Sequence, residues 1–243
     1  MLGSDIAKSG FEQEEAFKNS FNQNLDFKKQ ICDFIKMPYS AVAYKIPGMK
    51  HDIQIASPHS FDYKNIQIKR YKGDGFNQVD KRFHTQWHGI IPDLFIDDLS
   101  KFTGASNWPS KTRSKPCELS QYFIDNLHKY QKEIIHSSLF KHSNVDYFFC
   151  FNEKQKLTMY TKQDLLDLVL AHPVEIKDKR TTINLGQYVT WQRKGGDSGA
   201  ITATMTQTKM KTGKVCEHLL LIKKAKSIEY AQYRVQDQLS LGL

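Results

Sequence analysis

The hydrophobic positions of this chain follow two different periods. Helical spacing of apolar residues predicts helices at 5–24, 27–37, 76–102 (two helices divided near Pro92), 118–140, 162–171 and 217–240. Strict alternation or short apolar runs predict a strand hairpin at 52–69, a second hairpin at 145–160, and strands at 182–194 and 200–210. This order of elements predicts an α/β (α+β) fold with a central mixed β-sheet flanked by helices.

The first predicted hairpin carries the chemistry of interest. In the run HDIQI, Ile53 and Ile55 would face the core and Asp52 the other side, because alternate strand residues share a face. In the run NIQIK, Gln67 and Lys69 would likewise lie together on the side away from the core. One hairpin is therefore expected to hold a carboxylate, an amide oxygen and an ammonium group side by side.

These groups suit phosphodiester hydrolysis assisted by Mg²⁺. The cation polarises the phosphate, lowers the pKa of its bound water, and prefers oxygen ligands that include one or two carboxylates. Asp52 would be the principal ligand and the Gln67 amide oxygen a weaker one. Lys69 would orient or help deprotonate the water, or neutralise the developing charge. Glu14 or Glu15 on the first helix is available to complete the set. Taken alone, an acid followed by Q-x-K also occurs by chance, and a half-exposed polar strand face is then the favoured interpretation.

Composition narrows the class of protein. Of 243 residues, 40% are hydrophobic and 25% charged, which predicts a globular chain with a sizeable core. The 35 Lys and Arg against 26 Asp and Glu give a net charge of +9, which favours a polyanionic partner such as nucleic acid, although a basic enzyme is equally compatible.

The cysteines and the apolar runs indicate the cellular compartment in which we expect the protein. The four cysteines form no CxxC pair, no signal-like N-terminus is visible, and no apolar run approaches the ~20 residues of a membrane span. We therefore expect reduced thiols in a cytoplasmic protein that does not contact a membrane.

Longer strings around the hairpin resemble a known enzyme family. Four stretches resemble the small HinP-type type II restriction endonucleases of the PD-(D/E)xK nuclease superfamily. They are NIQIK followed by KGDGFNQVDKRF, the later run WQRKGGDSGAITATM, the opening LGSDIAKSGFEQE and the run KHDIQI. The resemblance covers 2–21, 50–83 and 191–207. It implies a single restriction-endonuclease-like domain over 1–243, with a catalytic part (1–103), a DNA-recognition part (104–213) and a C-terminal helical extension (214–243).

The resemblance also implies roles for particular residues. Asp52 falls on the motif aspartate, and Glu14 on the glutamate of the family's N-terminal helix. Gln67 and Lys69 fall on the family's Q-x-K, where most superfamily members carry an acid before the lysine. The implied reaction is Mg²⁺-dependent cleavage of both strands of double-stranded DNA at a short G·C-rich palindrome, GCGC or a related site.

A polar segment near residue 195 is expected to read the DNA bases. Gln192, Arg193, Lys194 and Asp197 surround a Gly-Gly turn. An arginine can bind guanine O6 and N7 together, and an aspartate can accept a hydrogen bond from cytosine N4. Without the resemblance, an ordinary charged hairpin turn is the favoured reading. The segment departs from the family's pattern at three positions, and an identical target therefore does not follow: Ser198, Ala200 and Ile201.

A second segment, GFNQVDKR, is expected to approach the DNA from the other groove. Asn77 and Gln78 resemble family residues on the minor-groove side. Lys81 and Arg82 would follow on the same helix as phosphate contacts, which position a protein without specifying sequence.

The expectation is therefore a bacterial, cytoplasmic restriction endonuclease that acts as a monomer or homodimer. A DNA methyltransferase of the same restriction-modification system would protect the host, without a stable complex. Two alternatives stay open. One is a repair nickase or structure-selective nuclease of the same fold. The other is a non-catalytic DNA-binding module, motivated by the neutral ligand Gln67.

Overall fold

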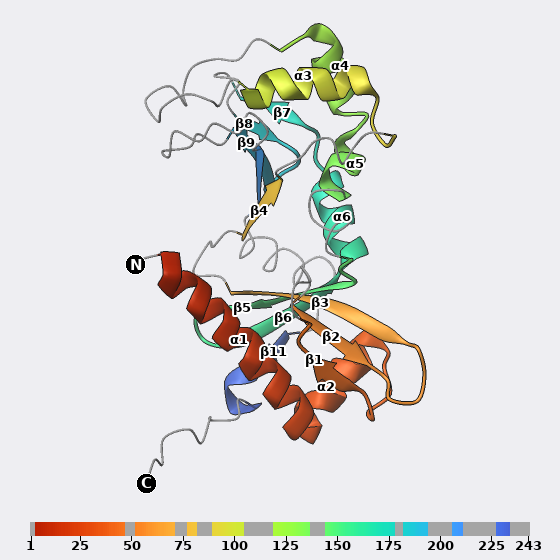
Figure 1. Ribbon diagram of the computed structural model, residues 1–243, viewed down its shortest axis with the longest axis vertical. Helices are drawn as coiled ribbons and strands as arrows, with labels where there is room; N and C mark the ends of the chain where they lie inside the picture. Colours follow the sequence, from red (N-terminus) through yellow and green to blue (C-terminus); the bar gives the residue numbers. More distant parts are fainter. Residues whose placement is uncertain are drawn as a thin grey trace. The chain divides into compact units, whose positions relative to one another are not determined.

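The computed structural model describes residues 3–46, 52–70, 77–81, 89–104, 119–136, 144–177, 182–193, 206–210 and 227–233. The chain divides into two compact units, each with its own sheet (Figure 1). The first comprises Met1–Gly73, Ser143–Lys162 and Cys216–Leu243, and the second Asp74–His142 and Gln163–Val215. The architecture is a mixture of helices and strands, as predicted. No described helix has the length and apolar character needed to cross a bilayer.

A six-stranded mixed sheet forms the first unit, in the order β1-β2-β3-β5-β6-β11. Only β3 and β5 run parallel among these pairs; the other neighbours are antiparallel. Both predicted hairpins are confirmed, with Ile53 opposite Ile66 and Tyr147 opposite Thr161. The strands are β1 (Val42–Tyr44), β2 (Ile53–Ala56), β3 (Tyr63–Arg70), β5 (Tyr147–Phe151), β6 (Lys156–Thr161) and β11 (Ser227–Glu229).

Two helices cover one face of this sheet, α1 (Gly3–Gln23) and α2 (Leu25–Ile35), and both were predicted (Figure 1). The alternating isoleucines of β2 and β3 are buried beneath them, as the strand pattern predicted. Each large apolar side chain that is fully buried stabilises the fold by about 1.5–3 kcal/mol. The core they share includes Phe17, Phe21, Phe27, Ile31, Ile35, Ile53, Ile55, Ile66, Ile68, Phe149 and Phe151.

An antiparallel sheet forms the second unit, in the order β4-β10-β9-β8-β7. Its strands are β4 (Asn77–Lys81), β7 (Glu175–Ile176), β8 (Thr182–Asn184), β9 (Val189–Arg193) and β10 (Thr206–Met210). The remaining helices are α3 (Asp93–Gly104), α4 (Gln121–Leu127), α5 (Gln131–His136) and α6 (Lys162–Leu170). The predicted helix at 162–171 is confirmed, and so is the predicted strand at 200–210 where residues are described. The single strand predicted at 182–194 is wrong, because bends at 185–188 divide it into β8 and β9, which pair antiparallel.

The helix predicted over Asn77–Lys81 is wrong. These residues form β4 and pair along their whole length with β10, from Asn77 opposite Met210 to Lys81 opposite Thr206. The pairing partner lies far away in the sequence, and local spacing of apolar residues carries no information about it. Lys81 is therefore a strand residue, and not a helix residue as expected from its motif.

Two other helix predictions also need correction. The pattern over 118–140 corresponds to two short helices, α4 and α5, separated by a turn at 128–130. Within the predicted helix at 217–240, Ser227–Glu229 form a strand on β6, followed by the 3-10 turn η4 (Tyr230–Tyr233). Burial explains this, because β11 places Ile228 and the following η4 places Tyr230 in the core of the first unit. The other residues of that predicted helix lie outside the described part of the chain.

Candidate active site and nucleic-acid interface

One carboxylate oxygen, Oδ2 of Asp52, is the centre of the predicted cluster. It accepts a hydrogen bond of 2.9 Å from Nε2 of Gln67 and one of 2.7 Å from the backbone N–H of Ile68. Nζ of Lys69 lies 3.7 Å from the same oxygen. The three side chains predicted to share one side of the hairpin are therefore brought together by the fold.

The local backbone explains why Asp52 occupies this position. Strand β2 begins at Ile53, which pairs with Ile66, and the Asp52 N–H donates to the Ile66 carbonyl at 3.1 Å. The described pairing of β2 with β3 ends at Ile53 and Ile66, and the N–H of Ile68 has its acceptor outside that pairing. The Asp52 carboxylate supplies it. The aspartate thus ends the two-strand ladder and is held in a defined orientation.

Burial differs among the three residues. Gln67 is 8% exposed, the Asp52 side chain 15% and the Lys69 side chain 29%. The amide is therefore inside the protein, while the ammonium group is accessible. The sequence pattern predicted a shared face for Gln67 and Lys69 but did not predict that the amide would be buried.

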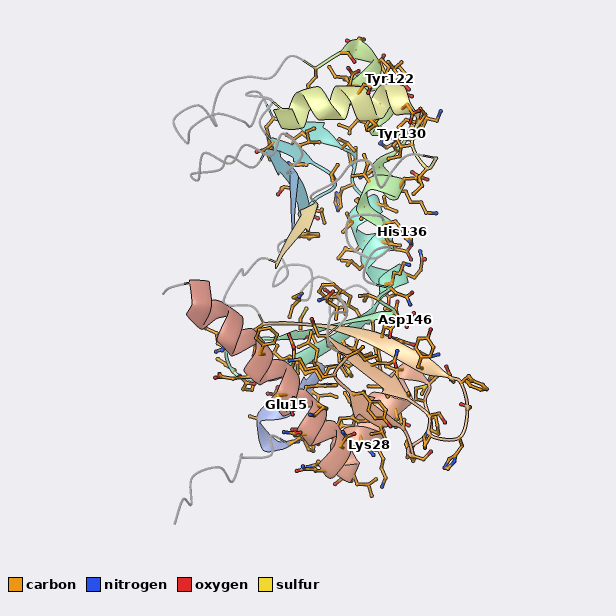
Figure 2. The ribbon with its side chains drawn as sticks, in the orientation of Figure 1. Glu15, Lys28, Tyr122, Tyr130, His136 and Asp146 are labelled. Carbon is orange, nitrogen blue, oxygen red and sulfur yellow. The ribbon has the colours of Figure 1, made fainter. Side chains whose placement is uncertain are left out.

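Glu14 joins this cluster from helix α1. Its pKa is raised, chiefly because burial disfavours the charged carboxylate, and the negative charge of Asp52 adds to the rise. A hydrogen bond from Lys45 and the positive charges of Lys45 and Lys69 oppose the rise. Glu14 thus lies within electrostatic range of both Asp52 and Lys69. Glu15, labelled on α1 in Figure 2, forms an ion pair with Lys18 instead.

Lys45 is a member of the cluster that the sequence did not reveal. Its Nζ lies 2.7 Å from Oε2 of Glu14 and 4.5 Å from the centre of the Phe11 ring. Lys45 follows β1, and the pairing of β1 with β2 brings it to this end of the sheet. No motif or spacing in the run AVAYK marks it, because its partner Glu14 is on a helix distant in the sequence.

The oxygen donors of the cluster match the preferences of Mg²⁺ in type. Two carboxylates, Asp52 and Glu14, and one amide are present, and Mg²⁺ is usually bound through one or two carboxylates. In the described residues, no three His, Cys, Asp or Glu side chains group together as a metal site. The amide nitrogen of Gln67 faces Asp52, so its amide group must turn before its oxygen lies beside that carboxylate.

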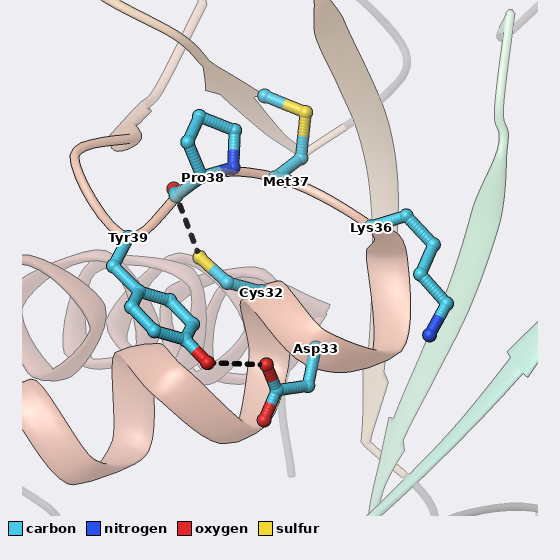
Figure 3. A pocket seen from close by; sticks show the side chains of 6 residues that line it. All are labelled: Cys32, Asp33, Lys36, Met37, Pro38 and Tyr39. Atoms are coloured by element: carbon cyan, nitrogen blue, oxygen red, sulfur yellow. Dashed lines mark hydrogen bonds between the residues drawn. The ribbon is translucent and has the colours of Figure 1, made fainter.

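A separate hollow of about 410 Å³ lies at the end of α2 and contains none of the predicted site residues (Figure 3). Cys32 donates to the Pro38 carbonyl at 3.5 Å, and Tyr39 donates to Asp33 at 2.7 Å. Burial is the main cause that raises the pKa of Cys32, to about 11. The thiol is therefore protonated at neutral pH and unsuited to nucleophilic chemistry. The hollow is lined by Cys32, Asp33, Lys36, Met37, Pro38 and Tyr39.

The two strings expected to contact DNA are neighbours in the second unit. Strand β10 pairs with both β4 and β9, and Thr206 stands opposite Lys81 on one side and Arg193 on the other. Adjacent strands are about 4.8 Å apart, so the backbones of Lys81 and Arg193 are about 10 Å apart. The fold thus brings the described parts of the two strings, 77–81 and 192–193, into one sheet.

The expected DNA-contacting residues do not all share one face of this sheet. In the pairing register, Gln78 and Gln192 lie on one face, and Asn77, Lys81 and Arg193 on the other. Arg82, Lys194 and Asp197 lie outside the described residues.

Comparison with known proteins adds no family assignment. A scan against protein-family models finds no match to this chain, and a search of curated proteins also finds none.

Proposed function

We propose that this protein is a Mg²⁺-dependent type II restriction endonuclease with a PD-(D/E)xK-type catalytic unit. The observation that carries the proposal is the convergence of Gln67, Ile68 and Lys69 on one oxygen of Asp52, with Glu14 in electrostatic range. A carboxylate that can bind a cation, beside an accessible ammonium group that can stabilise developing charge, suits metal-assisted phosphodiester hydrolysis.

Two further observations support the proposal. The strings that resemble HinP-type enzymes include every member of the cluster except Lys45. The second unit joins the two strings expected to bind DNA through β10, and the chain carries a net charge of +9. Double-stranded DNA with a short G·C-rich palindrome is the proposed substrate. A separate methyltransferase would protect the host's own DNA, and the nuclease would act in the bacterial cytoplasm as a monomer or homodimer.

Each residue of the cluster has its own role in the proposed reaction. When bound, Mg²⁺ would polarise the phosphate and activate a water molecule. Asp52, Glu14 and the Gln67 amide oxygen would hold the cation. Lys69 is charged and partly exposed, and it would orient the attacking water and neutralise charge on the phosphate. The N–H of Ile68 would keep Asp52 in place throughout.

Digestion of methylation-free plasmid in the presence of Mg²⁺ tests the proposal. We expect a discrete ladder of fragments, and sequencing of their ends gives the recognition site and the stagger. Asp52→Asn is the matched control; it keeps the side-chain volume and should give no ladder. A smear, or no cleavage with any divalent metal, would overturn the proposal. Conversion of supercoiled plasmid to nicked circle alone would identify a nickase of the same fold.

One observation favours a second candidate, a non-catalytic DNA-binding module. The position before Lys69 is an amide, and its nitrogen is directed at Asp52 in this structure. A neutral ligand binds Mg²⁺ more weakly than a carboxylate does. Duplex binding that is unaffected by Asp52→Asn, together with no cleavage under any metal, would establish this candidate.

A further inference from the structure

Lys45 is a charged member of the cluster that has no part in the reaction proposed above. Its Nζ lies 2.7 Å from Oε2 of Glu14, and the Lys45 side chain is 30% exposed against 14% for Glu14. Glu14 is also within the electrostatic range of Asp52 and Lys69. Because Glu14 is proposed to hold the cation, Lys45 already occupies a carboxylate that the cation needs.

The charges of the cluster balance without a cation. Asp52 and Glu14 carry two negative charges when both are ionised. Lys45 and Lys69 carry two positive charges, and each lies beside one of the carboxylates, Lys45 beside Glu14 and Lys69 3.7 Å from Asp52. A divalent cation held by the two carboxylates would therefore leave both ammonium groups without a counter-charge in the cluster. Phosphate groups of a nucleic acid are anions that can take this place.

Phe11 offers the Lys45 ammonium group a second contact that does not involve Glu14. Nζ lies 4.5 Å from the centre of the Phe11 ring, within the range of a cation–π interaction. Phe11 and Glu14 are three residues apart on α1, so they lie on the same side of the helix and Lys45 contacts both. Phe11 is 59% exposed. A lysine that rests on its ring therefore stays at the protein surface when it leaves Glu14.

We infer that Lys45 pairs with Glu14 in the cation-free protein and contacts a DNA phosphate once Glu14 binds the cation. A carboxylate oxygen that accepts from an ammonium group is also the type of oxygen that Mg²⁺ binds, so the two compete for Glu14. Once released, Lys45 would hold a phosphate of the backbone near the one that Lys69 neutralises, and such contacts position the DNA. The inference rests on the proposed function, which supplies both the cation and the phosphate.

The affinity of the full chain for Mg²⁺ in the absence of DNA tests the competition. It is obtained from the melting temperature as a function of Mg²⁺ concentration. We expect Lys45→Met to bind Mg²⁺ about 5- to 30-fold more tightly, because the substitution removes a competitor and a repelling charge. Lys45→Arg keeps the charge and should bind Mg²⁺ like the wild type. Lys18→Met is the matched control and should change nothing, since Lys18 is 28% exposed and pairs with Glu15 on the same helix.

Binding of a short duplex tests the phosphate contact. The duplex carries the site mapped by plasmid digestion and is titrated at several salt concentrations, in EDTA and in Ca²⁺, which takes oxygen ligands as Mg²⁺ does. In Ca²⁺, Lys45→Met should make the slope of log affinity against log salt shallower by about 0.9, and Lys45→Arg should restore it. In EDTA the slope should not change, because Lys45 is then paired with Glu14.

If Lys45→Met is unfolded by circular dichroism, Lys45→Gln replaces it with the same expected directions. The inference is overturned if the variant binds Mg²⁺ no more tightly than the wild type, or if their salt slopes in Ca²⁺ agree. A wild type that neither binds Mg²⁺ nor cleaves plasmid would instead overturn the proposed function itself.

Discussion

At the scale of single residues, the burial and orientation of Gln67 determine which ligands the candidate site offers to a cation. The side chain is buried, and its amide nitrogen donates to Asp52. In the absence of a cation this contact satisfies both groups, because the carboxylate accepts and the amide donates. A carboxylate at position 67 would instead repel Asp52 unless a cation lay between them. The neutral residue therefore makes the cation-free form more stable at the expense of a strong metal ligand.

Replacement of Gln67 by glutamate is expected to make the stability of the fold sensitive to Mg²⁺. Two carboxylates in one partly buried site raise the pKa of one of them, and the fold should lose about 1–3 kcal/mol at neutral pH. The loss should disappear as pH falls below the ordinary glutamate value, because protonation removes the repulsion. Thermal unfolding with and without Mg²⁺ measures both effects.

Mg²⁺ should raise the melting temperature of Gln67→Glu more than that of the wild type. Gln54→Glu is the matched control, since Gln54 is partly exposed on the neighbouring strand and its Nε2 donates to Oδ1 of Asn65. Equal Mg²⁺ shifts in all three proteins would show that Asp52 and residue 67 do not bind the cation together.

The ion pair between Lys45 and Glu14 predicts a pH-dependent stability. Burial raises the pKa of Glu14, so this carboxylate costs stability when it ionises, and Lys45 at 2.7 Å offsets that cost. Lys45→Met should therefore destabilise the fold by about 1–3 kcal/mol at neutral pH. The effect should shrink as pH falls toward 4.5, the ordinary value for glutamate, because protonated Glu14 no longer needs the partner.

Urea unfolding of Lys45→Met at several pH values measures this effect. Lys64→Met is the control, because Lys64 pairs with the exposed Asp62 and such surface pairs contribute only about 0–1 kcal/mol. A pH-independent loss in Lys45→Met would mean that Lys45 acts through packing on Phe11 and not through Glu14.

At the scale of elements, Asn22 ties helix α1 to the edge strand β1. Its Nδ2 donates to the Ala43 carbonyl at 3.0 Å, and its Oδ1 accepts from the Ala43 N–H at 2.9 Å. These two hydrogen bonds hold helix α1, which carries Glu14, beside the end of β1, which Lys45 follows. Asn22→Ala should cost about 1–3 kcal/mol, because both backbone groups of Ala43 lose their partner.

Asn24→Ala provides the comparison for this prediction. Asn24 caps α2 by accepting from the Phe27 N–H at 3.0 Å, and loss of such a cap costs about 1 kcal/mol. Chemical denaturation of both variants gives the two free energies, and cleavage assays show their consequence. If proposed catalysis depends on the tie, Asn22→Ala should lose activity at temperatures where it is still folded, and Asn24→Ala should not. Equal activities would assign Asn22 a purely structural role.

Elements could be predicted from the sequence where their partners are close along the chain. The hairpin of β2 and β3 follows from alternating isoleucines and a short turn, and α1 and α2 follow from helical spacing. β4 and β11 could not be predicted, since each is a strand only because of a partner far away in the sequence. The same reason applies to the site. Asp52, Gln67 and Lys69 share one hairpin, whereas Lys45 joins them through the pairing of β1 with β2 and through Glu14 on a helix distant in the sequence.

At the scale of the whole molecule, the net charge is the property that acts over distances longer than either sheet. A net charge of +9 produces a field that attracts polyanions, and counterions released from DNA make such binding sensitive to salt. The alternative of a merely basic enzyme predicts no such dependence. Salt titration therefore tests the DNA partner separately from cleavage.

Affinity of the wild type for a duplex of scrambled sequence should fall steeply between about 50 and 200 mM salt. If four or five phosphates are contacted, the log–log slope is about −4 and the fall about 100- to 1000-fold. Lys81→Ala should reduce the slope by about 0.9, because Lys81 is expected to contact one phosphate. Lys177→Ala is the control, since Lys177 is already paired with Glu175. Filter binding or fluorescence anisotropy supplies the measurement. A flat salt dependence in the wild type would exclude DNA as the polyanion that the charge suggests.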